Sequence, residues 1–132
     1  MKWSIIACLL LSCGQQRLIN SNNSRYYLGI SITEEIYFVS GEVRYSGRDF
    51  VAYGKYKIGN LFNLNKFVSR CKLVESNSGK SPFFPDQSSK VSWFVICSEM
   101  KRFELLDLTG QSSLIVWIDD SKGFIFVENA KW

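Results

Sequence analysis

The sequence predicts an all-β protein: a single antiparallel barrel or sandwich of about eight short strands, with little helix. Apolar residues recur with a period of two from Tyr26 onward, which is typical of half-buried strands. Short apolar runs are separated by Gly, Asn, Asp and Ser, the residues that favour turns. No segment keeps an apolar repeat of 3.6 residues long enough for a major helix. Short strands joined by tight turns form barrels or sandwiches.

The N-terminus predicts an export signal. Residues 1–12 hold one positive charge at Lys2, an apolar run and small residues at the end, as secretory signal peptides do. The run is shorter than the roughly 20 apolar residues that span a bilayer. We therefore expect residues 1–12 to direct export and then to be removed.

The end of this leader, Leu10-Leu11-Ser12-Cys13, resembles a bacterial lipobox, in which a leucine and a small residue precede a cysteine. The resemblance covers the first 13 residues and indicates the class of bacterial lipoprotein precursors. It implies that Cys13 is acylated, with palmitate or similar chains, and becomes the first residue of a membrane-anchored chain. Because Gly14 follows, and not Asp, the analogy points to the outer membrane. The alternatives are ordinary secretion, with cleavage after Gly14, and an uncleaved leader that acts as an anchor.

Three regions are expected along the chain. After the signal peptide, residues 13–25 are polar and turn-prone, which predicts a lipidated cysteine on a flexible tether. Residues 26–132 are then one β domain, since about 120 residues suffice for one core but not for two.

The first predicted strands lie at residues 26–32, 36–39, 42–45 and 50–58. Leu28, Ile30 and Ile32 would share one face of the first strand. Ser40-Gly41 is typical of a two-residue hairpin turn between the second and third strands. Residues 46–49 contain Gly and Asp and predict the turn before the fourth strand.

The later predicted strands lie at residues 67–74, 91–98, 103–108, 114–119 and 124–127. Residues 61–66 are compatible with a short helix or a loop. Residues 75–90 form the longest irregular segment. The strand at 91–98 is apolar on both faces, which favours a central position, and residues 119–123 predict the last turn.

Cys71 and Cys97 remain in the predicted domain, and an even pair of cysteines in an exported domain favours a disulfide. It would close the loop of residues 72–96 and stabilise the fold by roughly 3–4 kcal/mol in the chain-entropy model. Two separate buried thiols are the alternative.

The composition argues against several chemistries. With no histidine in the chain, Ser-His-Asp and Cys-His catalysis are absent, and a zinc site has few ligands; we expect no metal site. The acidic pairs Glu34-Glu35 and Asp119-Asp120 lie at predicted turns, where carboxylates stay solvated. Glycine-rich phosphate or dinucleotide loops are also absent. We expect neither an enzyme nor a cofactor, and the net charge of +4 is too small to predict nucleic-acid binding.

Two groups of residues are candidates for partner binding. Tyr53, Lys55 and Lys57 would project from one face of the strand at 50–58 and could bind acidic glycans or lipid headgroups by charge and stacking. Alternatively, these lysines only prevent pairing between sheet edges. Phe83 and Phe84 lie between prolines in the segment 75–90 and could insert into a partner, or instead cover an open end of the barrel.

These observations predict an exported, lipid-anchored β domain without enzymatic activity, which binds a protein or a component of the cell envelope. The alternatives are an inhibitor or immunity-type protein that acts through residues 75–90, and a β-barrel carrier of a small apolar ligand. A hydrolase would need two inward carboxylates facing one cleft.

Overall fold

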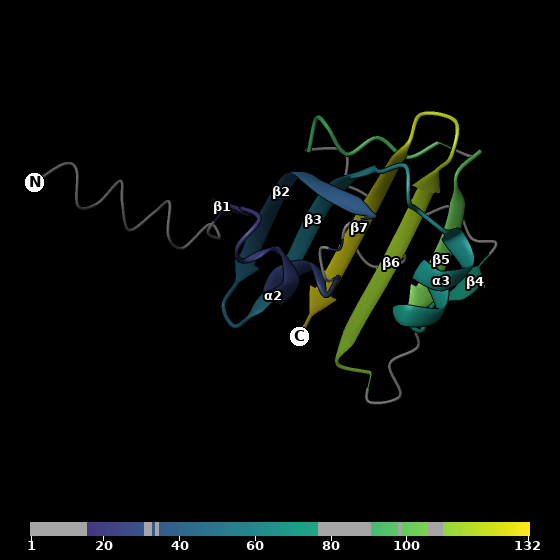
Figure 1. Ribbon diagram of the computed structural model, residues 1–132. Coiled ribbons are helices and arrows are strands. Elements are labelled where there is room, and N and C mark those ends of the chain that lie inside the picture. Colours follow the sequence, from purple (N-terminus) through teal and green to yellow (C-terminus); the bar gives the residue numbers. More distant parts are fainter. Residues whose placement is uncertain (1–15, 31–32, 34, 77–90, 98, 106–109) are drawn as a thin grey trace, which may run out of the picture.

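The computed structural model describes residues 16–30, 33, 35–76, 91–97, 99–105 and 110–132, and these form one antiparallel sheet of seven strands with two short helices (Figure 1). The prediction of an antiparallel all-β fold with little helix is confirmed. The strands are ordered β1-β2-β3-β7-β6-β5-β4, so the described sheet is open and β1 and β4 form its edges.

Two hairpins meet in the middle of the sheet, where β3 pairs with β7 over eight residue pairs from Phe50–Lys131 to Lys57–Phe124. The elements are β1 (Gln16–Leu18), α2 (Ser24–Leu28), β2 (Ile36–Ser46), β3 (Asp49–Ile58), α3 (Leu64–Arg70), β4 (Val74–Ser76), β5 (Lys101–Leu105), β6 (Ser112–Asp119) and β7 (Phe124–Lys131).

The strongest predicted strands and turns are confirmed. Strands β3, β6 and β7 cover the predicted segments, and β5 covers the described part of the segment at 103–108. The predicted turns at residues 46–49 and 119–123 each contain a glycine with positive φ, +65° at Gly47 and +76° at Gly123. This conformation is easy for glycine and costly for other residues.

The predicted hairpin at Ser40-Gly41 is wrong, because β2 runs through it without turning. The pairing of β2 with β3 shifts by one residue between Phe38 and Ser40, which marks a β-bulge. Gly41 serves close packing: a Cβ there would lie 2.7 Å from Ile19 Cβ and 3.0 Å from the Phe38 ring.

The predicted strand at 26–32 is wrong over its described part, where the chain forms α2. Gly29, with φ of +71°, ends this helix and donates its N–H to the Arg25 carbonyl at 2.9 Å. Leu28 and Ile30 are both buried, as the alternation predicted, but they come from a helix end and the loop after it. Ile32 lies outside the described residues.

The predicted strand at 67–74 is also wrong, because its first half belongs to α3. The Asn63 side chain caps the helix, with Oδ1 accepting from the Lys66 N–H at 3.0 Å. Phe67 is fully buried on its inner side. The helix ends at Arg70, and only Val74–Ser76 is extended, as edge strand β4.

The described part of the expected tether at 13–25, residues 16–25, is folded. β1 pairs with β2 from Gln16–Arg44 to Leu18–Glu42. Ile19 is also buried, so the chain from residue 16 onward belongs to the folded domain. The domain boundary therefore lies before residue 26.

The sheet carries a hydrophobic cluster on each face, because both sides of its central strands are apolar. The first cluster includes buried side chains of α2 and α3; Figure 1 shows both helices over the sheet. Its buried members are Ile19, Leu28, Ile30, Ile36, Val43, Phe50, Ala52, Tyr56, Phe67, Leu73, Phe103, Leu114, Val116, Ile118, Ile125 and Val127. The second cluster consists of Val51, Tyr53, Val91, Phe94, Ile115, Trp117, Phe126 and Ala130.

Candidate binding surface

Strand β3 presents Tyr53, Lys55 and Lys57 on the second face of the sheet, as the period of two predicted. The opposite residues of β3, among them Ala52 and Tyr56, belong to the first cluster. The three candidates differ in exposure: Tyr53 is buried, Lys55 is half-buried and Lys57 is exposed. Only the two lysines can therefore meet a partner directly.

Tyr53 is buried because residues 91–96 cover this part of the sheet. Phe94 packs against Tyr53, Trp117 and Phe126, with ring centroids 5.0, 5.7 and 5.6 Å apart. The predicted central strand at 91–98 is thus wrong: its described residues form a turn at 91–93 and irregular chain at 94–97, and they are not part of the sheet. The prediction of Tyr53 as a contact residue is corrected for the same reason.

A group of four residues, which we call the lysine strip, lies beside this cover: Tyr37, Lys55, Lys57 and Phe124. The register places Tyr37 opposite Lys57 on one side and Phe124 opposite it on the other. The Lys55 ammonium lies 4.1 Å from the centre of the Phe124 ring and 5.6 Å from that of Phe126. This cation–π contact holds one positive charge in place, while Lys57 remains exposed and Tyr37 is 55% exposed.

The same face carries a buried polar row, in which Glu42, Tyr53 and Glu128 are opposite one another on β2, β3 and β7. Glu42 Oε2 accepts from the Arg44 guanidinium at 3.1 Å. Burial, reinforced by the two carboxylates, raises the pKa of Tyr53. Its hydroxyl has no hydrogen-bond partner among the described residues. Because both carboxylates are also buried, neither is open to a substrate from solvent.

The acidic pairs predicted at turns have local structural roles where they are described. Asp119 Oδ1 accepts from the Ser121 hydroxyl at 2.7 Å and from the Lys122 N–H at 3.1 Å. The hydrogen bond from Ser121 is the main cause of the lowered Asp119 pKa. Asp120 is exposed, and Glu34 lies outside the described residues.

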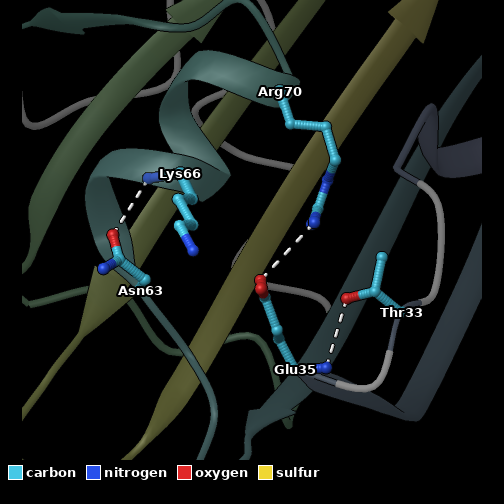
Figure 2. A network of polar contacts seen from close by, with 5 residues as sticks. All are labelled: Thr33, Glu35, Asn63, Lys66 and Arg70. Atoms are coloured by element: carbon cyan, nitrogen blue, oxygen red, sulfur yellow. Dashed lines mark hydrogen bonds and ion pairs between the residues drawn. The ribbon is translucent and has the colours of Figure 1, made fainter.

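Glu35, of the other pair, connects α3 to the chain that enters β2. Its carboxylate accepts from the Arg70 guanidinium at 3.4 Å, and its N–H donates to Thr33 Oγ1 at 3.2 Å (Figure 2). The Arg70 side chain is 37% exposed, so this ion pair stabilises the fold only weakly.

The cysteines predicted to form a disulfide are free thiols in the structure. Cys71 follows α3 and packs against the first cluster, whereas Cys97 follows Ile96, which packs against the second. The two segments therefore lie on opposite faces of the sheet. Cys71 is half-buried, which raises its pKa, and Cys97 is exposed; the alternative of two separate thiols fits, although Cys97 is not buried.

Three further candidates, Cys13, Phe83 and Phe84, lie outside the described residues. Within the described ranges, no three His, Cys, Asp or Glu residues form a group that could hold a metal ion. In the same part of the chain, no helix is long and apolar enough to cross a membrane.

The sequence analysis missed Tyr37 and Phe124 in the lysine strip and both carboxylates of the buried row. The period of two does place Phe124 opposite a lysine once β3 and β7 are known to pair, but that pairing joins distant segments. Tyr37 faces Lys57 only because of the bulge in β2.

No family model, curated protein or solved structure matches the chain.

Proposed function

We propose that the chain is an exported lipoprotein whose β domain binds a partner of the cell envelope through the lysine strip, without catalysing a reaction. The observation that carries the binding role is the strip itself. It places Lys57 between Tyr37 and Phe124 in the register, and the Lys55 ammonium over the Phe124 ring, on the second face of the sheet. Rings and fixed cations together suit a partner with acidic groups on a flat or apolar framework, such as an acidic glycan or an acidic protein segment.

The anchoring role is supported by the leader and by the lipobox-like Leu10-Leu11-Ser12-Cys13. In this proposal Cys13 carries the acyl chains and holds the domain at a membrane of the cell envelope. Because Gly14 follows the cysteine, the analogy with bacterial lipoprotein sorting points to the outer membrane. Several acyl chains give much longer retention than one. The non-catalytic role is supported by the burial of Glu42 and Glu128, because neither of these carboxylates is open to a substrate from solvent.

A capture experiment tests the binding role. The lipidated chain, purified from solubilised envelopes, is used as bait beside the double variant Lys55→Gln/Lys57→Gln. The matched control is Lys66→Gln/Lys72→Gln, which removes two exposed lysines on and after α3. We expect the wild type and the control to capture the same partner, and the strip variant to lose it. Equal capture by all three proteins would contradict the proposed surface.

Salt dependence gives an independent check. Exposed charge pairs weaken as the Debye length falls from about 10 Å at 0.1 M salt to about 3 Å at 1 M. Capture through Lys57 should therefore decline steadily over this range. Capture that is unaffected by salt would show that the lysines do not carry the interaction.

A further inference from the structure

A second aromatic and basic group lies at the opposite end of β3 from the lysine strip. We call it the tyrosine end: Arg17, Tyr26, Tyr27, Tyr45 and Lys131. These residues come from β1, α2, β2 and β7, which the fold brings together around Phe50. Figure 1 shows β1, β2 and α2 together, away from α3 and β5.

The rings of the tyrosine end are in mutual contact. Tyr27 lies 4.9 Å from Tyr26 and 6.3 Å from Tyr45 between ring centroids. The Tyr45 hydroxyl donates to the Tyr27 hydroxyl at 2.7 Å. Burial and this hydrogen bond raise the pKa of Tyr45 to about 12, so Tyr45 stays uncharged at neutral pH.

Two cations complete the group. The Arg17 guanidinium carbon lies 5.9 Å from the Tyr45 ring centre, and the Lys131 ammonium lies 5.9 Å from that of Tyr26. Both basic residues are exposed, and Tyr26 is 67% exposed. Arg48, in the adjacent β2–β3 turn, and Asp49, at the start of β3, carry opposite charges and add no net charge. The tyrosine end therefore exposes a phenol ring together with a net positive charge.

This combination fits the surface of an anionic bilayer. Tyrosine rings favour the membrane–water interface, where the ring is shielded and the hydroxyl remains hydrated. Arg and Lys near the surface are attracted to anionic headgroups.

The position of the proposed anchor selects the same occupant. Cys13 is three residues before Gln16, where β1 begins, so even a fully extended chain separates them by only about 11 Å. A lipid on Cys13 would therefore keep Arg17 and its neighbours close to the headgroups. The seven-residue distance from Phe50 to Lys57 along β3 corresponds to roughly 23 Å, which places the lysine strip farther from the membrane.

We infer that the tyrosine end docks on the anionic surface of the bilayer that holds Cys13, and that this contact orients the lysine strip toward a partner beyond the headgroups. This inference rests on the proposed lipoprotein function. Docking adds a second contact to the acyl anchor and gives the domain a defined orientation.

Tyrosine nitration, located by mass spectrometry, tests the orientation. The lipidated chain is placed in vesicles of phosphatidylglycerol and phosphatidylethanolamine, or of phosphatidylcholine alone. We expect Tyr26 to be nitrated about tenfold more slowly on the anionic vesicles, because two nearby cations bind that surface. Tyr37, which is similarly exposed but belongs to the lysine strip, is the internal control and should react equally on both.

Charge variants separate docking from mere proximity. Arg17→Gln/Lys131→Gln should restore fast nitration of Tyr26 on anionic vesicles, since losing both cations weakens docking about 30-fold. Lys66→Gln/Lys122→Gln, with the same change in charge elsewhere, should leave Tyr26 protected. Equal nitration of Tyr26 on the two kinds of vesicle would overturn the inference.

The intact mass of the same samples distinguishes the two possible failures. A mass without acyl chains overturns the proposed function and this inference with it. A lipidated chain whose Tyr26 stays reactive overturns the docking orientation alone.

Discussion

Replacing Gly54 by alanine tests the packing of α2 on the sheet, which sequence reasoning did not foresee. A Cβ at residue 54 would overlap Leu28 Cδ1 and lie 3.0 Å from Cδ2 and 3.2 Å from Cγ. Leu28 is fully buried at the end of α2, so it cannot turn outward to make room. Overpacking of this kind costs typically 1–3 kcal/mol, and the reduced freedom of the unfolded chain returns about 0.4–1 kcal/mol. We expect a net loss of about 1–2 kcal/mol.

The assay is urea unfolding of four proteins: the wild type, Gly54→Ala, Leu28→Ala and the double variant. Leu28→Ala alone should cost about 2–5 kcal/mol. In the Leu28→Ala variant, the methyl group added at residue 54 enters the space that the leucine vacated, so Gly54→Ala should be neutral or stabilising there. The interaction energy between the two substitutions should therefore reach about 1–3 kcal/mol. Gly47→Ala is the control, because a Cβ there meets no atom within 4 Å and its cost should not depend on Leu28. Additive effects of Gly54→Ala and Leu28→Ala would refute the packing of α2 against β3.

Three further predictions concern the second face and the thiols. Phe94→Ala should lower the free energy of unfolding by about 3–5 kcal/mol and expose Tyr53, measured by urea unfolding and by nitration; a loss below about 1 kcal/mol would show that residues 91–96 do not cover the sheet. Because burial raises the pKa of Tyr53, its contribution to the free energy of unfolding should be fully present below pH 10 and should be lost as the pH rises further. Tyr53→Phe should reduce this loss. A free energy of unfolding that does not change above pH 10 in the wild type would contradict the prediction. Under non-reducing conditions, a thiol reagent should modify Cys97 quickly and Cys71 slowly; no reactive thiol at either position would indicate the disulfide instead.

The period of two predicted the parts of the sheet that have one apolar residue at every second position. In β3 it correctly separated Ala52 and Tyr56 from Lys55 and Lys57. The glycine turns at Gly47 and Gly123 were equally clear, because positive φ favours glycine. These features depend on neighbouring residues alone.

The errors arise where distant contacts decide the local structure. Leu28 and Ile30 alternate as strand residues would, yet Gly29 ends a helix between them. Residues 91–96 are as apolar as a central strand because they cover one face of the sheet, and burial on a sheet leaves the same pattern as burial within it. The two cases differ only in where the segment lies relative to the sheet, which the segment's own sequence does not show.

The lysines of the lysine strip were predicted from the sequence, but Tyr37 was not, because contacts between strands decide its position. A regular hairpin with its turn at residues 46–49 would pair Lys57 with Phe38, but the bulge shifts the register and brings Tyr37 there. Phe38 then packs against Tyr56 at 5.7 Å in the first cluster. One inserted residue thus decides which ring joins the lysine strip, and no local signal in the sequence marks it.

The most direct test of the central claim, an acyl-anchored exported domain, is the intact mass of the chain recovered from cell envelopes. We expect a chain that begins at Cys13 and carries diacylglycerol, and we expect Cys13→Ser to abolish this addition. A chain that keeps residues 1–12, or one cut after Gly14 without any lipid, would contradict it.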